Sequence, residues 1–431
     1  MLPESSLTDA GIRVAPAKSH RTQIENLAYA LCFLPLFFGI RFITVTLQVV
    51  RFRRILSAVH RTAGVRNRVL YLEAFFPENA GYHYRTQKWV DLLNEGGFEA
   101  RIRYVFERET FERLLSKPKV KSFQSIFLLR RMWQCLAALG FNCVIVRREL
   151  LVFNDYGDLF LDKLLLALHP NVILDFDDDL AAAKREPREI TPFGRLMFEN
   201  PQKFADSLRL YSRFIVGSRY LRGLLTAQSG KLSDAEMITI PTCVDYEKHA
   251  AKDYDGESEC INFGWVGSAA NQYLLEIVKP VLSQVARKRK IRFILITSDG
   301  YEPNVDFEVI KVPWRLETEI ESLYRIDVGL MPLYDGPEER GKCGFKLIQY
   351  MGLGIVSIAS AVTVNTEIVD DGQSGFLVHR ETDWLRVIEE ALARRSEFAQ
   401  IGAAARKKIQ GQFSFQANKQ QYLDFIRASV A

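Results

Sequence analysis

Cysteine and histidine are both scarce in this chain, which has six of each among its 431 residues. No two cysteines form a Cys-x-x-Cys pair, and no cluster of histidines accompanies them. This pattern argues against a disulfide framework and against a zinc site built from cysteine and histidine. It fits a protein that works in a reducing cytoplasm.

Excess charge of one sign is also small, since 57 Lys and Arg against 52 Asp and Glu give a formal net charge of +5. No zinc-finger, homeodomain or RNA-recognition signature is found, so we expect no nucleic-acid partner. Low-complexity linkers and short-period repeats are lacking as well. What the chain does contain is 48% hydrophobic residues, which predicts a large packed core shared among two or three domains.

The longest apolar stretch lies near the N-terminus, at residues 27–50. As a helix it would be roughly 36 Å long, enough for a ~30 Å hydrocarbon core. It contains Arg41, which is costly at mid-membrane, and Pro35 and Gly39, which would kink a helix. A membrane span, an interfacial or re-entrant element and a buried core helix therefore all remain open.

Arginines crowd the C-terminal flank of this stretch, at positions 51, 53, 54, 61, 66 and 68. The run is either a solvated face or a surface attracted to anionic lipid. By the positive-inside rule, the same flank favours a location at the cytoplasmic face of the inner or plasma membrane, anchored by residues 27–50.

Beyond Arg68, short apolar runs alternate with helical segments in two successive sets. The first set of expected strands is at 69–72, 100–105, 143–146, 172–174 and 214–216. The second set follows a polar patch at 248–259 and is at 262–266, 293–296, 307–312, 328–331 and 355–358. This alternation predicts an α/β protein with two doubly wound, Rossmann-like domains, whose ligands bind at the carboxyl ends of the strands in the cleft between them.

The loop after the expected strand at 328–331 is rich in glycine, with Gly336, Gly341 and Gly344 before a helix that begins near Phe345. Glycines let the backbone approach a ligand closely, and a helix N-terminus presents free N–H groups. A second strand, at 262–266, leads into Gly267 and Ser268. That turn is neither a Walker A nor a G-x-G-x-x-G motif, so it is a weaker candidate for a phosphate loop.

Cationic side chains accompany the longer of these loops, namely Arg340, Lys342 and Lys346. Lys346, Gln349 and Tyr350 share one face of the expected helix, at spacings of three and four residues. The combination of glycines, cations and a helix N-terminus suits a diphosphate, and the alternative is a solvated basic loop before an ordinary helix.

An aspartate run, VILDFDDDL, places Asp175, Asp177, Asp178 and Asp179 at the end of another expected strand. Carboxylates this dense need a metal ion, cations or water. The run fits a D-x-D metal site, a phosphotransferase with Asp175 as nucleophile and Asp177 as acid, an acceptor-side wall of the cleft, or a charged turn. No Gly-Thr follows the aspartates, which argues against the phosphotransferase.

Smaller candidates follow two other strands of the first set: Gly81, Tyr82, His83, Arg85, Arg148 and Glu149. His83 is a candidate catalytic group because histidine titrates near neutral pH, although a lone histidine in a loop is more often structural.

The stretch DVGLMPLYDGPEERGKCGFKLIQYMGLGIVSIASAVTVNTEIVDDGQSGFLV resembles the donor-binding segment of group 1 (family 4) glycosyltransferases. INFGWVGSAANQYL continues the resemblance, and RREL and ILDFDDDL extend it more weakly into the first half. The resemblance implies a GT-B fold, a nucleotide-diphosphate sugar as donor, retention of anomeric configuration, and no cofactor or essential metal.

The chain departs from this family at several positions. Many members carry two glutamates eight positions apart, where Gly341 and Gln349 stand here. The Arg and Lys that often follow the glycine-rich strand are absent, and Ser268 and Asn271 occupy that region. Donor identity and the roles of individual residues are therefore left open by the resemblance.

The residues themselves and the resemblance together give three groups of expected site residues. The expected catalytic residues are Lys346, Arg340, Asp175 and His83. The expected donor-binding residues are Gly267, Ser268, Asn271, Trp314, Asp335, Lys342, Gly344, Phe345, Gln349, Asn365, Thr366 and Glu367. The expected acceptor-side residues are Gly81, Tyr82, Arg85, Arg148 and Glu149.

The expected organisation has four parts: a membrane-associated segment at 1–67, an acceptor domain at 68–248, a donor-binding domain at 249–412, and a helix at 413–431 that crosses back to the first domain. The expected partners are a nucleotide sugar, a lipid-linked or oligosaccharide acceptor, and a membrane surface. The expected process is polysaccharide or glycolipid biosynthesis. Two other functions stay open, a metal-dependent phosphotransferase that uses the aspartate run and a catalytically silent GT-B scaffold.

Overall fold

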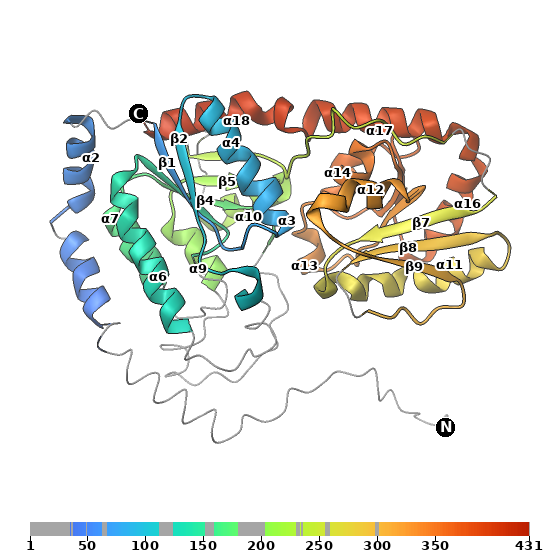
Figure 1. Cartoon of the computed structure of the whole chain (residues 1–431), viewed down its shortest axis with the longest axis horizontal. Helices are drawn as coiled ribbons and strands as arrows, with labels where there is room; N and C mark the ends of the chain where they lie inside the picture. Colours follow the sequence, from blue (N-terminus) through green and yellow to red (C-terminus); the bar gives the residue numbers. More distant parts are fainter. Residues whose placement is uncertain are drawn as a thin grey trace, which may run out of the picture.

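The computed structural model describes residues 35, 38–48, 50–62, 67–111, 124–150, 159–179, 203–229, 233, 236–254, 259–297 and 301–430. These residues form two α/β domains that lie side by side, each built on a six-stranded sheet (Figure 1). Every strand pair in both sheets is parallel. The predicted fold class, α/β with two doubly wound domains, is confirmed.

The first sheet has the order β2-β1-β3-β4-β5-β6. Its strands are β1 (Arg68–Leu72), β2 (Glu99–Arg103), β3 (Cys143–Arg147), β4 (Val172–Phe176), β5 (Phe214–Val216) and β6 (Met237–Thr239). The second sheet has the order β12-β11-β10-β7-β8-β9. Its strands are β7 (Ile261–Val266), β8 (Ile291–Thr297), β9 (Glu308–Pro313), β10 (Val328–Met331), β11 (Val356–Ser360) and β12 (Phe376–Val378).

Helices cover both faces of each sheet, so the central strands are apolar on both sides. All five residues of β3, β4 and β11 are buried. Parallel strands between two helical layers have near-continuous hydrophobic sequences, which is why the runs at 143–146 and 172–174 identified these strands correctly. The shorter β6 and β12, with three residues each, were not predicted.

The helices of the N-terminal domain are a helix at 38–48, α2 (Phe52–Thr62), α3 (Ala80–Tyr82), the π-helix η1 (His83–Gln87), α4 (Lys88–Glu95), α6 (Gln124–Ala137), η3 (Ala138–Gly140), α7 (Phe160–Leu168), α9 (Lys203–Leu210) and α10 (Arg219–Ser229). Those of the C-terminal half are η4 (Ala269–Ile277), α11 (Lys279–Ala286), η5 (Leu316–Thr318), α12 (Glu319–Tyr324), α13 (Pro337–Arg340), α14 (Phe345–Gly352), α15 (Asn365–Ile368), η6 (Glu381–Asp383), α16 (Trp384–Ala393), η7 (Arg395–Glu397), α17 (Phe398–Gln412) and α18 (Phe415–Val430).

The helical segment between β7 and β8 is divided in two. A 3-10 helix, η4, ends at Ile277, and α11 begins at Lys279 with Pro280 in its first turn. Proline has no N–H to donate and its ring clashes with the preceding turn, so a continuous helix through this position is unfavourable.

The last two helices lie on different domains. Figure 1 shows α17 and α18 running along one side of the molecule, α17 over the second sheet and α18 over the first. On the first domain, the ring of Tyr422 stacks on Trp89 with a centroid separation of 4.1 Å, and its hydroxyl bonds to that of Tyr71. Phe415 adds an edge contact to Trp89 at 5.1 Å. The end of the chain thus completes the core of the N-terminal domain.

The N-terminal apolar stretch is described only in part, because residues 27–34, 36, 37 and 49 lie outside the described residues. Its helix at 38–48 buries Ile40 and Thr44 against the N-terminal domain, and Ile40 joins the core beneath α7. Within the described ranges, no helix combines the length and the apolar character needed to cross a membrane.

The packing of α18 leads to a stability prediction. Tyr422→Ala removes a ring that is 2% exposed and stacked on Trp89. We expect it to lower the free energy of unfolding by roughly 3–5 kcal/mol, the range for deleting a large buried aromatic side chain. Urea unfolding followed by tryptophan fluorescence measures this change. Gln421→Ala, at an exposed position of the same helix, is the control, and an equal effect of both variants would contradict the packing described here.

Candidate functional site

The two sheet orders place the loops with polar residues at defined edges. In the second sheet, β7 lies between β10 and β8, so the direction of strand succession reverses between β7 and β10. In open α/β sheets, ligands bind outside the carboxyl ends of the strands at such a reversal. The loop after β7 starts at Gly267, and the loop after β10 runs from Pro332 to Gly344. These are the two glycine-containing loops selected from the sequence.

Gly267 lies close to the side chains of Trp265 and Lys346. A Cβ at this position would lie 2.5 Å from the ring of Trp265 and 2.9 Å from Cε of Lys346. The Nζ of Lys346 is 5.4 Å from the centroid of the Trp265 ring, which is a cation–π contact. The absence of a side chain at Gly267 therefore lets Lys346 lie directly against the end of β7.

Lys346 carries a perturbed ionisation. Burial, together with the nearby charge of Lys342, lowers the pKa of Lys346 to about 8. A lysine held in this way gains stability when an anion arrives, because the anion offsets both the desolvation and the repulsion. Perturbed groups of this kind concentrate at functional sites.

A polar chain extends from Lys342 to the loop after β7. The Nζ of Lys342 donates to Oδ1 of Asn271 at 3.0 Å, and Nδ2 of Asn271 donates to Oγ of Ser268 at 3.2 Å. The structure thus brings together four expected donor-binding residues and Lys346 at the reversal between β7 and β10. Two cations and two neutral polar side chains at one edge can bind an anion such as a diphosphate.

Arg340 and Asp335 pair with each other. Nε and Nη2 of Arg340 donate to the two carboxylate oxygens of Asp335, at 2.7 and 3.0 Å, and both side chains are largely exposed. This exposed ion pair joins the last residue of α13 to the loop just before the helix. The guanidinium of Arg340 therefore points to Asp335. Gly344, at the end of the same loop, directly precedes α14 and has a φ of +68°, a conformation that favours glycine.

Trp314 and Gln349 converge on a carboxylate that was not selected from the sequence, that of Glu319. Nε1 of Trp314 donates to Oε1 of Glu319 at 2.7 Å, and Nε2 of Gln349 donates to the same oxygen at 2.8 Å. The hydroxyl of Tyr84, in the N-terminal domain, donates to Oε2. Burial raises the pKa of Glu319, against the effect of these three hydrogen bonds. Glu319 stands among Glu317 and Glu321, so the sequence holds no signal that distinguishes it.

The loop after β11 holds three more expected donor-binding residues. Asn365 is fully buried, and its Nδ2 donates to the carbonyl of Ser360 at 3.0 Å, which fixes the start of α15. Thr366 bonds locally to the carbonyl of Thr363. Glu367 faces the first domain, where Nε of Arg219 lies 3.8 Å from its Oε2.

The first two carboxylates of the aspartate run form ion pairs with buried arginines. Nη2 of Arg85 lies 2.7 Å from Oδ1 of Asp175, and both side chains are almost completely buried. Nη2 of Arg147 donates to Asp177 at 2.7 Å, and the hydroxyl of Thr242 donates to the same carboxylate at 2.9 Å. Burial alone would raise the pKa of Asp177, but the charges of Arg147 and Arg85 bring it below its ordinary value. Asp177 is therefore an ionised member of a buried network that also contains Asp175.

The remaining expected residues of the first domain lie around this network. Gly81 donates its N–H to Oδ1 of Asn79 at 2.8 Å, and Tyr82 packs edge-on against Tyr104. His83 begins the π-helix η1, half-buried, and burial followed by the charge of Lys88 lowers its pKa. A lowered pKa keeps this imidazole neutral at pH 7, so it could accept a proton.

Arg148 and Glu149 follow β3, next to the strand reversal between β1 and β3 in the first sheet. Arg148 has a φ of +66°, and its Nη1 lies 3.9 Å from Oδ2 of Asp178. Non-glycine residues in this conformation are strained and cluster at functional sites. Glu149 is paired with Nζ of Lys203 at 2.7 Å, so it is engaged in a structural ion pair.

The two domains touch directly at these loops. The N–H of Asp179 donates to the carbonyl of Gly341 at 3.2 Å. A Cβ at Gly341 would lie 2.2 Å from the Cβ of Asp179, so no side chain fits there in this arrangement. The rings of Tyr84 and Phe345 meet with centroids 4.8 Å apart. Gly341, the position where the family resemblance would lead one to expect a glutamate, therefore makes a close contact between the domains.

Known proteins resemble this chain in the sequence of its C-terminal domain and in the fold of both domains. Residues 261–394 match the family model described as "Glycosyl transferases group 1". The matched segment contains β7 to β12 and both glycine-containing loops. No curated protein sequence matches the chain.

Solved structures match nearly the whole described fold. A glycosyltransferase from Rickettsia africae ESF-5 has a TM-score of 0.59 and 13% identity, over 85% of this chain and 99% of its own. Sucrose-phosphate synthase from Thermosynechococcus elongatus has a TM-score of 0.59 and 14% identity, over 84% of this chain and 98% of its own. Anabaena HepE, solved in complex with UDP-glucose, has a TM-score of 0.58 and 12% identity, over 83% of this chain and 99% of its own. These are GT-B glycosyltransferases, and at such identities the likeness shows the fold.

The contact at Gly341 can be tested by adding one methyl group. Gly341→Ala places a Cβ against the backbone and Cβ of Asp179, neither of which is the end of a flexible side chain. We expect the two domains to separate, with a loss of about 1–3 kcal/mol in the free energy of unfolding, as for overpacking of a core. Small-angle X-ray scattering should report a larger radius of gyration.

Gly336→Ala is the matched control in the same loop. A Cβ at Gly336 meets only the carboxylate end of Glu339, at 2.6 Å, and that side chain can move. The contact between Gly341 and Asp179 is refuted if both variants scatter like the wild type.

Proposed function

We propose that this chain, whose residues 261–394 match the family model of the group 1 glycosyl transferases, is a retaining glycosyltransferase that needs no metal ion. It transfers a sugar from a nucleotide-diphosphate sugar to a lipid-linked glycan acceptor, in polysaccharide or glycolipid biosynthesis, at the cytoplasmic face of the membrane. The observation that carries the donor assignment is the position of Lys346 and Lys342 at the strand reversal between β7 and β10.

The proposed chemistry depends on the leaving group. Departure of the nucleoside diphosphate develops negative charge on a phosphate oxygen, and fixed cations stabilise that charge in the transition state. Lys346 and Lys342 supply these cations, and the N-terminus of α14 at Phe345 adds a favourable dipole. The bond from the anomeric carbon to the diphosphate breaks, and the acceptor oxygen bonds to the same face. The acceptor proton moves to the leaving phosphate oxygen.

Glu319 gives the donor domain a second polar centre. Tyr84 of the first domain caps its carboxylate, while Trp314 and Gln349 hold it from the second domain. When the domains separate, Tyr84 withdraws and the carboxylate becomes able to accept hydrogen bonds from the ribose hydroxyls of the donor. Domain motion then couples donor entry to the interface at Gly341.

The acceptor is assigned to the first domain. Arg148 lies at the strand reversal in a strained conformation, with its side chain partly exposed, and suits an acceptor that carries phosphate. His83 lies at the start of η1 in the same domain, and its pKa is lowered. A membrane location is supported by the apolar stretch at 27–50 and its arginine-rich flank.

The phosphotransferase alternative is not favoured by the geometry. A nucleophilic aspartate must reach its substrate, whereas Asp175 is 3% exposed and lies between Arg85 and Arg147. The silent-scaffold alternative rests on the missing glutamates, and the following experiment separates it from the proposal.

Thermal stabilisation by a panel of nucleoside diphosphates and nucleotide sugars tests the donor site. Ligand at a hundredfold excess over its Kd adds ~2.7 kcal/mol of stability, which raises Tm measurably. We expect one nucleotide to stabilise the wild type equally with magnesium and with EDTA, and to lose this effect in Lys346→Ala. Lys407→Ala, an exposed lysine on α17, is the control.

Each outcome of this experiment points to one function. Stabilisation that requires magnesium and depends on Asp175 would transfer the function to the aspartate run. No stabilisation by any nucleotide would favour the scaffold. With the donor identified, the anomeric configuration of the product, determined by NMR, decides whether the reaction retains or inverts.

The lowered pKa of Lys346 predicts a pH dependence for nucleotide binding. The diphosphate binds the protonated lysine, which predominates below the pKa of about 8 and is lost as the pH rises through it. Above pH 8, we expect affinity to fall by up to about tenfold per pH unit until the pKa of the complex is reached. Titration calorimetry from pH 7 to pH 9.5 measures this. Lys346→Arg should bind with little change over the same range, and a steep decline in that variant would assign the dependence to another group.

A further inference from the structure

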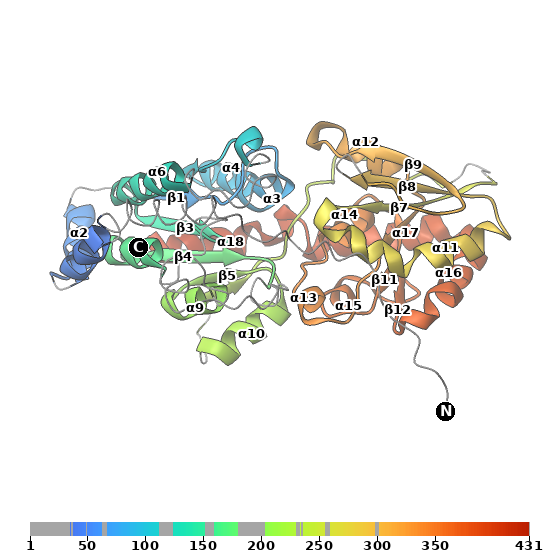
Figure 2. The same cartoon turned by 90° about the horizontal axis from the view of Figure 1, so that it is seen from below.

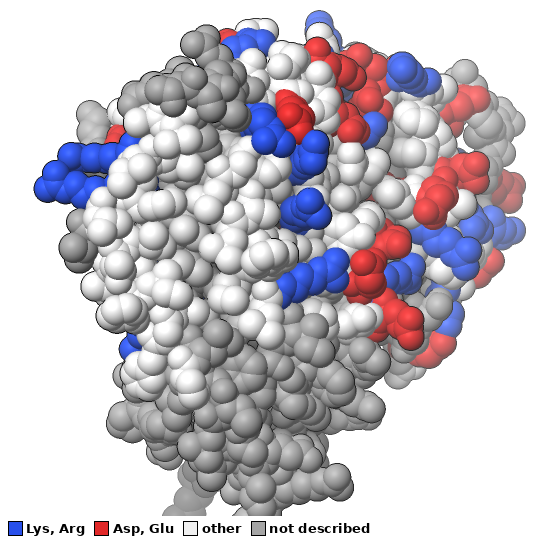
Figure 3. Space-filling view, turned by 60° about the vertical axis from the view of Figure 1, so that its left-hand side comes forward, with Lys and Arg blue, Asp and Glu red and all other residues white. Residues whose placement is uncertain are grey.

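The end of the N-terminal domain farthest from the C-terminal domain presents an unusual surface. In Figures 1 and 2, the helix at 38–48 and α2 lie at this end, outside α7. Figure 3, turned toward this end, shows a broad field of uncharged residues, with Lys and Arg side chains along its edges and Asp and Glu side chains beyond them on one side. No aspartate or glutamate occurs in the sequence between Glu25 and Glu73. This surface is separate from the donor-binding residues.

The two helices bury one apolar face and expose another. Ile40, Thr44 and Leu47 point toward the protein, so packing against the domain is already provided. The opposite face exposes 75% of Phe42, 51% of Ile43 and 57% of Val45. On α2, Ile55 and Val59 are exposed by 52% and 51% at a spacing of four residues. Contiguous apolar patches on a protein surface usually contact another apolar phase.

Three hydroxyl groups of these helices are satisfied internally. Thr44 donates to the carbonyl of Ile40, Thr46 to that of Phe42, and Ser57 to that of Arg53, at 2.8, 2.9 and 3.0 Å. Each bond reaches back four residues along its own helix. Polar groups that need no water can be transferred into a poorly hydrated environment at little cost.

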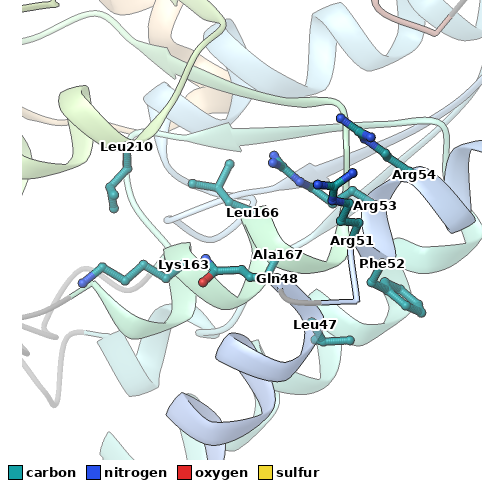
Figure 4. Close-up of a pocket in the computed structure, with 10 residues that line it drawn as sticks. All are labelled: Leu47, Gln48, Arg51, Phe52, Arg53, Arg54, Lys163, Leu166, Ala167 and Leu210. Carbon is teal, nitrogen blue, oxygen red and sulfur yellow. The ribbon is translucent and has the colours of Figure 1, made fainter.

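A basic pocket lies where the helix at 38–48 meets α2. It has a volume of about 420 Å³ and is lined by Arg51, Arg53 and Arg54 on one side and by Lys163 and Leu166 of α7 on the other. Figure 4 shows the three guanidinium groups gathered on one side of the helix junction, with the ring of Phe52 pointing away from them. Arg51 has a φ of +52°, which turns the chain at this junction.

The charge of this pocket is not balanced by carboxylates within the part of the chain that the structure describes. Among the described residues, no carboxylate forms an ion pair with Arg51, Arg53, Arg54 or Lys163. The three guanidinium groups gathered on one side of the pocket repel each other, and an anion beside them would relieve that repulsion (Figure 4). Arginine in particular binds phosphate through paired N–H donors.

We propose that this surface docks onto a bilayer rich in anionic phospholipid, with the apolar face of both helices in the interface and a phospholipid headgroup phosphate in the pocket. A helix of this type lies in the membrane plane with its apolar face between the headgroups and the acyl chains. The inference deepens the proposed membrane location by naming its contact residues. It does not depend on the proposed glycosyl transfer, because no donor residue takes part.

The experiment measures partition of the full-length chain onto vesicles of phosphatidylcholine, with and without phosphatidylglycerol, by flotation. A basic residue near an anionic surface contributes about fivefold in affinity, equivalent to about 1 kcal/mol. We expect Arg51→Gln with Arg54→Gln to weaken partition onto phosphatidylglycerol vesicles about 25-fold. Arg289→Gln with Lys290→Gln, which removes two exposed cations at the far domain, should leave it unchanged.

The apolar contact is tested separately at Phe42. Phe42→Ala should weaken partition about tenfold, because the ring no longer leaves water, while Phe42→Trp should preserve it. Since Phe42 is mostly exposed, neither substitution removes a core side chain, and an unchanged Tm confirms that both variants fold.

Three results would overturn the proposal: equal partition of the wild type with and without phosphatidylglycerol, equal partition of the two double variants, or no difference between the two Phe42 variants. Displacement from vesicles by inorganic phosphate, beyond that by chloride at equal ionic strength, would instead identify the pocket as a site for free phosphate. Nucleotide binding by the same variants without vesicles should equal that of the wild type, so a failure here is distinguishable from a failure of the donor site.

Discussion

Parallel pairing of the strands is the constraint on which the rest of the structure depends. Because the described strands of each sheet all run in one direction, every loop that follows a strand emerges at the same edge. The loops after β7 and β10 therefore meet, and Lys346 comes to lie on Trp265 although the two residues are far apart in the sequence. The same rule gathers Asp175, Arg147 and Arg85 at the edge of the first sheet.

The sequence predicted the fold because buried parallel strands leave a signal in hydrophobic runs, as at 143–146 and 262–266. It also predicted which loops would gather, since glycines and lysines stand out after strand ends. It could not predict pairing between side chains of similar type. Glu319 looks like its neighbours Glu317 and Glu321, and only the fold brings it to Trp314, Gln349 and Tyr84. Likewise, the contact of Gly341 with Asp179 is set by domain packing and not by local sequence.

The proposed membrane contact and the proposed donor site lie on different domains. The helix at 38–48 and α2 lie at the far end of the N-terminal domain, whereas α14, which carries Lys346 of the proposed donor site, lies in the C-terminal domain (Figures 1 and 2). A membrane contact at that end would not involve the second domain. The second domain could then move relative to the first at the contacts of Gly341 and Tyr84. Arg148, which we propose for the acceptor side, belongs to the domain that carries the proposed membrane contact, and this suits the proposed lipid-linked acceptor.

The most direct test of the central claim is a crystal structure of the chain with the stabilising nucleoside diphosphate bound. The account predicts that the diphosphate lies at the carboxyl ends of β7 and β10, between Gly267 and the amine of Lys346, with Lys342 as a second cation. A diphosphate bound instead beside Asp175 and Asp177, or at the basic pocket next to α2, would contradict the assignment of the donor site.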